Sequence, residues 1–143
     1  MKPRFFMDAS AIFSMITSKT GGARELLRLA ILDQITLITS VYAFIEVKRA
    51  IGRHDPSLTH FVDQLQAQSF WRIVNHDPNE IPNAKQAVTD PDDAPIIAAT
   101  KLAKVDGLIS FDRKHLHTKE VEAYINAPVI TPGDALQLIR SSQ

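Results

Sequence analysis

The sequence contains no cysteine, and this absence excludes several kinds of chemistry. Disulfide frameworks, thiolate zinc sites and thiol nucleophiles all need cysteine sulfur. The absence does not by itself fix the cellular compartment.

The first residues do not have the pattern expected of a secretory signal, and long apolar runs are missing. It reaches an acid, Asp8, too early to hold the apolar core of a signal peptide. The longest apolar stretch covers residues 35–47, is too short to span a bilayer, and contains Thr39, Ser40 and Glu46. We therefore expect a cytoplasmic protein with no membrane segment.

An excess of charge of one sign is missing as well. The 16 basic and 16 acidic residues give a formal net charge of zero, so no basic field covers the whole protein. Nucleic-acid binding remains open, since a local basic patch is enough for it. The 143 residues, 45% of them hydrophobic, predict a single domain over residues 1–143 with a good apolar core.

Strand-like runs alternate with helical periodicity along the chain. In the helix expected over 41–53, the apolar stripe Val41, Phe44, Ile45 and Ile51 leaves Glu46 off the buried face. The alternation predicts an α/β fold with a central, mostly parallel sheet of about five strands flanked by helices. The strands are expected at residues 4–7, 35–39, 70–74, 107–111 and 129–130, and the helices at 9–16, 23–32, 41–53, 56–68, 81–88, 94–103 and 132–139.

Four carboxylates stand at the ends of these elements. Asp8 and Asp112 follow strands, Asp93 opens a helix, and Glu46 lies on the helix after the second strand. Sites in open parallel sheets form beyond the carboxyl ends of strands, so we expect the four acids to meet there. Gathered anions repel one another unless a cation binds them, and carboxylates suit Mg²⁺ or Mn²⁺.

Each acid taken alone has a simpler explanation. Asp8 would cap the following helix, and Asp112 would cap the turn at 113–115. The segment 90–93 would be a turn with redundant caps, and Glu46 would be an ordinary solvated residue. The joint pattern favours the site, because every acid lies where a doubly wound sheet places active-site groups.

Five segments resemble the PIN-domain family, which includes the VapC-type toxin ribonucleases. They are residues 6–10 (FMDAS), 40–47 (SVYAFIEV), 90–99 (DPDDAPIIAA), 108–112 (LISFD) and 128–132 (PVITP). The resemblance spans nearly the whole chain and implies a three-layer sandwich. It also implies a metal-dependent endoribonuclease that hydrolyses RNA phosphodiester bonds with Mg²⁺ or Mn²⁺, as the toxin component of a toxin–antitoxin pair.

The family's acidic site falls on Asp8, Glu46, Asp93 and Asp112, with Asp92 as an auxiliary residue or the alternative to Asp93. The implied partners are RNA, a small antitoxin that blocks the acidic pocket, and a second copy of the chain. The first helices and the helix over 55–68 are the candidates for the homodimer interface.

Two positions deserve comparison with the family pattern. Many relatives carry a second acid three residues after the one that matches Asp112, and here that place holds His115. This histidine either lowers metal affinity or has no effect. Two residues after Asp8, where asparagine or serine is common, stands Ser10.

The chemistry follows from hard-cation binding. An ion held by Asp8 and Asp93 would bind a phosphate oxygen and lower the pKa of a bound water, while Glu46 and Asp112 would complete the coordination, directly or through water. A second ion ~3.5–4 Å away would stabilise the leaving oxygen.

Several polar residues near the acids have two readings each. Ser10 and Ser110 would orient water or phosphate, or serve as cap and strand-end hydroxyls. Four basic residues would either neutralise RNA phosphates or form a solvated face. They are Arg49, Arg53, Arg113 and Lys114.

Other function classes fit less well. A non-catalytic RNA- or protein-binding module with the PIN fold would be favoured by a lost acid, but all four are present. A phospho-acceptor receiver domain needs a paired acid near the first strand, and Asp8 is alone. A haloacid-dehalogenase-type phosphatase needs Asp-x-Asp there, and the third position is Ser10.

Overall fold

The centre of the molecule is a parallel sheet of five strands, seen in a computed structural model that describes residues 1–142. The strand order is β3-β2-β1-β4-β5, and all four pairings are parallel. This confirms the predicted α/β class. The strands are β1 (Arg4–Met7), β2 (Thr36–Thr39), β3 (Arg72–Ile73), β4 (Gly107–Ile109) and β5 (Val129–Ile130).

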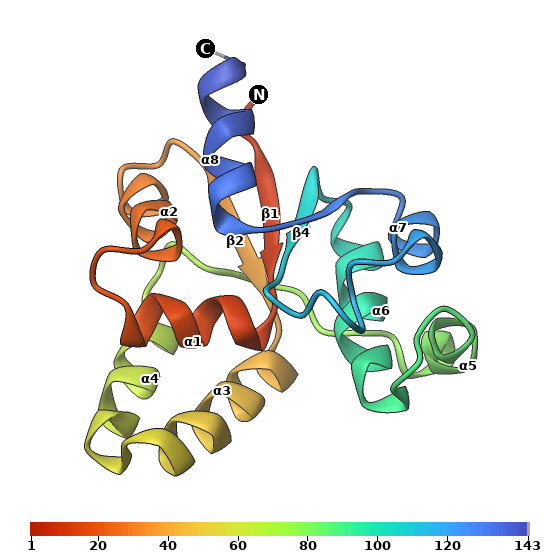
Figure 1. The fold of residues 1–143 in the computed structure, drawn as a ribbon, viewed down its shortest axis with the longest axis horizontal. Helices are drawn as coiled ribbons and strands as arrows, with labels where there is room; N and C mark the ends of the chain where they lie inside the picture. Colours follow the sequence, from red (N-terminus) through yellow and green to blue (C-terminus); the bar gives the residue numbers. More distant parts are fainter. Residues whose placement is uncertain (143) are drawn as a thin grey trace.

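Helices cover both faces of the sheet, as Figure 1 shows. Side chains of α1, α2, α3, α4 and α8 share a core with one face, and those of α5, α6 and α7 share a core with the other. The expected three-layer sandwich is therefore confirmed. The helices of residues 1–142 are α1 (Ala9–Thr17), α2 (Gly22–Ile31), α3 (Val41–His54), α4 (Thr59–Gln66), α5 (Ile81–Lys85), α6 (Ala94–Ala103), α7 (Lys119–Ile125) and α8 (Pro132–Ser141).

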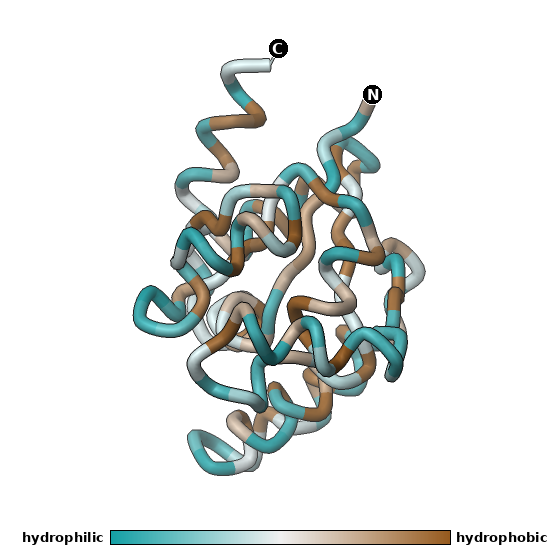
Figure 2. Tube along the Cα trace, turned by 90° about the vertical axis from the view of Figure 1, so that its right-hand side faces the viewer, coloured by the Kyte–Doolittle hydropathy of each residue, from teal (hydrophilic) through white to brown (hydrophobic). Residues whose placement is uncertain are grey.

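The central strand β1 serves both cores because successive side chains of a strand point to opposite faces. Phe5 and Met7 join the first core, and Phe6 joins the second. Along the helices, short hydrophobic segments alternate with hydrophilic ones (Figure 2), as amphipathic elements with one buried face require. Among residues 1–142, no helix combines the length and the apolar character needed to cross a bilayer.

The order in which the chain adds strands to the sheet reverses between β1 and β4. It runs from β1 through β2 to β3 at one edge, then returns to place β4 and β5 on the other side of β1. In the register of the two neighbours, Phe5 pairs with Gly107 and Met7 pairs with Ile109. A Cβ at Gly107 would lie 3.0 Å from the Cδ1 of Ile130, so glycine permits this close packing. The switch point therefore lies at the carboxyl ends of β1 and β4, where ligand sites form.

Several element boundaries differ from those that the sequence predicts. The helix expected over 56–68 begins as a 3₁₀ turn (Pro56–Leu58) before α4, and the helix expected over 81–88 ends at Lys85. The strand expected over 70–74 shortens to Arg72–Ile73, because Trp71 turns into the core. There its indole nitrogen donates a 3.0 Å hydrogen bond to the Leu65 carbonyl.

Two further expectations about helices are corrected. Helix α7 was not predicted, although Thr118 caps it by accepting a hydrogen bond from the Val121 amide at 3.2 Å. In α3, the apolar stripe is shifted: Val41 and Ile45 are 42% and 45% exposed. The buried face of α3 consists instead of Ala43, Phe44, Val47 and Ile51.

Two isoleucines on α3 allow a matched test of core packing. Ile51 is fully buried, whereas Ile45 is 45% exposed. We expect Ile51→Ala to lower the free energy of unfolding by about 2–5 kcal/mol, through lost burial and the cavity left behind. Ile45→Ala should change it by less than about 0.5 kcal/mol. Urea denaturation measures both, and equal losses would contradict the assigned face of α3.

Candidate acidic metal site

Asp8 lies directly beyond β1, at the switch point of the sheet. Its backbone amide donates to the Ile109 carbonyl at 3.1 Å, which continues the pairing of β1 with β4 by one residue. Its side chain is 5% exposed. Burial raises the pKa of this carboxyl, and hydrogen bonds from Ser110, Ser10 and the Ala11 amide oppose the shift.

Hydrogen bonds to both oxygens fix the Asp8 carboxylate. Oδ1 accepts from the Ser10 hydroxyl at 2.7 Å and from the Ala11 amide at 3.0 Å, while Oδ2 accepts from the Ser110 hydroxyl. Asp8 therefore does cap α1, as the simpler explanation requires. The cap uses Oδ1, so Oδ2 keeps acceptor capacity toward the site.

The two serine hydroxyls hold the ends of β1 and β4 together. The Ser10 hydroxyl accepts from the Phe111 amide at 2.9 Å, and the Ser110 hydroxyl accepts from the Asp112 amide at 2.9 Å. Both hydroxyls donate to Asp8. Their hydrogen bonds to protein groups indicate that these serines position the acids.

Asp93 stands at the start of α6, after a 3₁₀ turn (Pro91–Asp93). Its side chain makes no capping hydrogen bond, and its buried Oδ2 has no hydrogen-bond partner within residues 1–142. The pKa of Asp93 rises to about 6, first through burial and then through the charges of Asp90 and Asp112. An orphaned buried carboxylate oxygen is costly in a folded protein, and a bound cation would remove that cost.

Asp112 follows β4 and faces His115 across a short turn. Its Oδ1 accepts from the His115 backbone amide at 3.1 Å, and its Oδ2 lies 3.2 Å from the His115 Nδ1. The expected capping of this turn is therefore present. One ligand atom from each of Asp93, Asp112 and His115 lies within 4.8 Å of the others.

Glu46 reaches the same region from α3. The pKa of its carboxyl rises to about 7, through burial first and then through the charges of Asp93, Asp8 and Asp92, while Arg49 lowers it. A charge acts on a neighbouring pKa only at short range. Glu46 therefore shares one electrostatic environment with Asp8 and Asp93, and its explanation as an ordinary solvated residue is wrong.

The donor set suits a hard divalent cation. Asp93, Asp112 and His115 form the geometric group, and the charges of Asp8 and Glu46 act within the same set of acids. None of the four acids forms an ion pair with lysine or arginine within residues 1–142. Ions such as Mg²⁺ and Mn²⁺ prefer such oxygen ligands. The residues that would hold the ion are Asp93 and Asp112, with Asp8 and Glu46 nearby.

The auxiliary and basic residues lie less centrally. Asp92 is exposed, and its backbone carbonyl accepts from the Tyr42 hydroxyl at 3.1 Å, so the alignment with Asp93 is preferred. Arg53 lines a groove with Glu46 between α1 and α3, of about 680 Å³.

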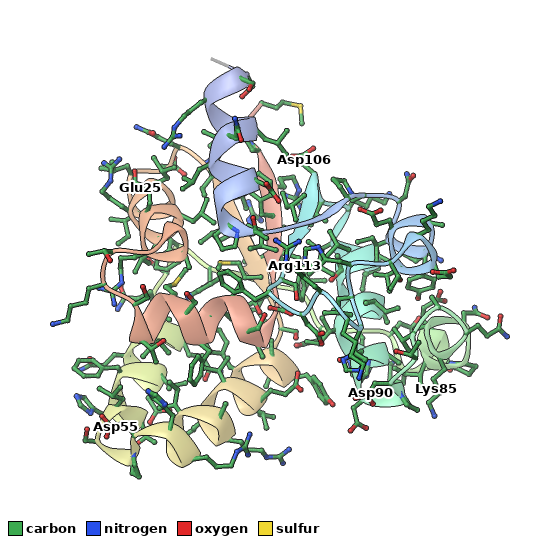
Figure 3. All side chains as sticks on the ribbon, in the orientation of Figure 1. Glu25, Asp55, Lys85, Asp90, Asp106 and Arg113 are labelled. Carbon is green, nitrogen blue, oxygen red and sulfur yellow. The ribbon has the colours of Figure 1, made fainter. Side chains whose placement is uncertain are left out.

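The basic residues after β4 do not reach the acids by any described contact. Arg113 and Lys114 are both exposed. Figure 3 labels Arg113 on the loop after β4. Hydrogen bonds from Thr131 lower the pKa of Asp134, in the first turn of α8, and the charge of Arg113 adds a smaller effect.

Two further residues lie beside the acids in roles that the sequence did not predict. The hydroxyl of Tyr42, which stands four residues before Glu46, has a raised pKa, through burial and then the charges of Glu46 and Asp92. His117 Nε2 lies 2.7 Å from the Ser110 carbonyl.

A model of the PIN domain matches residues 4–114. VapC20 of Mycobacterium tuberculosis, a sarcin–ricin-loop-cleaving toxin, aligns with a TM-score of 0.62 and 15% identity, over 77% of this chain and 91% of that one. VapBC2 from Rickettsia felis, bound to a DNA fragment from its promoter, aligns with a TM-score of 0.61 and 10% identity, over 89% of this chain and 96% of that one. A comparison with curated proteins found no significant match. At these identities, the structural likeness establishes the shared fold.

The raised pKa of Glu46 predicts how stability depends on pH without metal. The folded state holds this proton more tightly than the unfolded state, whose pKa is 4.5. Stability from the protonated form is therefore lost as the pH rises from 4.5 through about 7. In metal-free protein at pH 8, Glu46→Gln should raise the free energy of unfolding by on the order of 1 kcal/mol, after solvent screening.

Glu120→Gln, at an exposed position of α7, is the matched control and should change stability by less than about 0.5 kcal/mol. Urea denaturation at pH 4 and pH 8 measures both variants. A Glu46→Gln gain that is the same at both pH values would show that Glu46 does not carry this pH dependence.

Proposed function

This chain belongs to the PIN-domain family, and we propose that it is a metal-dependent endoribonuclease, the toxin component of a toxin–antitoxin pair. One observation carries the proposal: burial first, and then neighbouring acids, raise the pKa of Glu46 to about 7 and that of Asp93 to about 6, beside the group of ligand atoms from Asp93, Asp112 and His115. Partly buried carboxylates that raise one another's pKa are typical of sites built for a cation.

The roles of the acids follow from the acceptor capacity that remains on each carboxylate oxygen. Asp8 would bind the ion through Oδ2, because Oδ1 already accepts two hydrogen bonds. Asp93 would bind through its unpartnered Oδ2, and Asp112 through Oδ2. Glu46 would orient a water molecule from the side of α3. A bound Mg²⁺ or Mn²⁺ supplies a water of lowered pKa and a positive charge beside the phosphate.

The reaction that fits these groups is hydrolysis of a phosphodiester bond. Water attacks phosphorus in line with the leaving 3′ oxygen, so the products carry a 5′-phosphate and a 3′-hydroxyl. The choice of RNA over DNA rests on family membership and on the likeness to VapC20, which cleaves the sarcin–ricin loop. Ser10 and Ser110 hold the acids in place during this step.

A groove beside the acids offers a path for the RNA strand. It has a volume of about 680 Å³ and contains Glu46 and Arg53, with Phe111 at its edge. Arg53, and Arg49 near Glu46, would neutralise backbone phosphates, so binding should weaken with added salt. The exposed Arg113 and Lys114 would extend this basic contact beyond β4.

The same proposal includes two protein partners. A small antitoxin would place a basic side chain among the acids and block the ion and the RNA. A second copy of the chain would cover a groove of about 510 Å³ between α1, α2 and α4, where Ile31 and Phe61 are 62% and 45% exposed. Exposed apolar patches of this kind mark protein interfaces.

Replacing Asp8 tests catalysis. We expect Asp8→Asn to reduce Mn²⁺-dependent cleavage of single-stranded RNA by at least about 10²-fold, the size of loss typical when one charge-stabilising group is removed. The amide keeps the shape of the carboxylate and still pairs with both serines, so circular dichroism should show an intact fold. Gel analysis of end-labelled RNA measures the rate.

Asp63→Asn is the matched control, because Asp63 lies on α4 and pairs with Lys48 at the surface. It should cleave at the wild-type rate. Undiminished cleavage by Asp8→Asn would remove Asp8 from the mechanism. A wild-type protein that binds RNA but never cleaves it with Mg²⁺ or Mn²⁺ would support the alternative function, a non-catalytic RNA-binding module.

The homodimer has its own test. We expect the wild-type protein to be a dimer at micromolar concentration and Phe61→Asp to be a monomer, because a charge in an apolar interface must be desolvated. Leu138→Asp is the control, since Leu138 is 48% exposed on α8, outside the groove. Light scattering after gel filtration measures the masses. A wild-type monomer, or an unaffected Phe61→Asp dimer, would reject this interface.

A further inference from the structure

His115 stands three residues after Asp112, on the turn that follows β4. The Asp112 carboxylate holds this residue at two points, because Oδ1 accepts from the His115 backbone amide and Oδ2 lies 3.2 Å from the ring Nδ1. The imidazole is half-buried, with 35% of its side chain exposed. Its position is therefore set by the site.

The ring also lies near the second acid of the site. One ligand atom each from Asp93, Asp112 and His115 falls within 4.8 Å of the other two. An octahedral ion with bonds of about 2.1 Å separates its ligand atoms by about 3 Å at right angles and about 4.2 Å across. One ion can thus contact all three residues after small side-chain adjustments.

A second observation points the same way. Asp93 Oδ2 is buried and has no hydrogen-bond partner among the residues that the structure describes. A buried carboxylate oxygen needs a donor or an ion, and neither serine hydroxyl beside Asp8 bonds to it. An ion next to His115 would satisfy this oxygen.

We propose that His115 is a direct imidazole ligand of the cation that Asp93 and Asp112 hold, so that this site selects Mn²⁺ over Mg²⁺. The inference rests on the proposed metal-dependent function. Imidazole binds first-row transition ions well, whereas Mg²⁺ keeps to oxygen ligands and water.

A competing role is purely positional: His115 would orient Asp112 by hydrogen bonding and never contact the ion. His115→Asn separates the two roles, because its amide can still donate to Asp112 but is a poor transition-metal ligand. His115→Asp supplies a carboxylate in place of the ring. His60→Asn, at an exposed position of α4, is the control for loss of a histidine elsewhere.

The experiment uses metal-free full-length protein without RNA. Isothermal titration with Mn²⁺ and with Mg²⁺ gives the ratio of the two dissociation constants for each variant. Electron spin-echo envelope modulation of bound Mn²⁺ reports directly whether a ¹⁴N nucleus is coordinated. Circular dichroism confirms that each variant is folded.

We expect a ¹⁴N coupling in the wild-type protein and in His60→Asn, and none in His115→Asn or His115→Asp. The preference for Mn²⁺ over Mg²⁺ should fall at least tenfold in both His115 variants. Bound Mn²⁺ without nitrogen coupling in the wild type, or an unchanged ratio in His115→Asn, would overturn the inference and leave the proposed nuclease intact. A wild-type protein that binds neither ion would overturn the metal-dependent function as well.

Discussion

The buried carboxylate of Asp8 is the constraint on which the rest of the site depends. It lies at the switch point, where the parallel strands β1 and β4 are neighbours and the order in which the chain adds strands to the sheet reverses. Hydrogen bonds from Ser10 and Ser110 tie it to the segments after β1 and β4, and those hydroxyls accept from the Phe111 and Asp112 amides. The acid after β4 is therefore positioned by the acid after β1.

The same arrangement stores electrostatic repulsion. Burial and mutual repulsion raise the pKa values of Asp8, Glu46 and Asp93, so the ion-free fold is stabilised by protons on groups that should be charged in water. Asp93 could have relieved part of this cost by capping α6, yet its side chain makes no capping bond. The helix forgoes a stabilising contact, and the oxygen stays free for an ion.

The positions of the two acids that follow strands could be predicted from the sequence. Asp8 and Asp112 follow apolar strands, so the topology of a parallel sheet places them together. The buried face of α3 was predicted less accurately. Ile45, which was expected on that face, is exposed, and Val47 is buried in its place. The packing of α3 against both cores decides that rotation, and helical periodicity alone leaves it open.

The partners of individual polar side chains could not be predicted from the sequence either. Arg113 and Asp112 are adjacent in the chain, yet Arg113 is exposed while the Asp112 carboxylate lies against His115. Ser10 and Ser110 have hydroxyls suited to holding water, yet both hydrogen-bond to protein groups. Short polar side chains at strand ends have many possible partners, and only the packed backbone selects among them. Asp93 Oδ2 remains without a hydrogen-bond partner among residues 1–142, so the packing that selects the other partners leaves one acceptor for a cation.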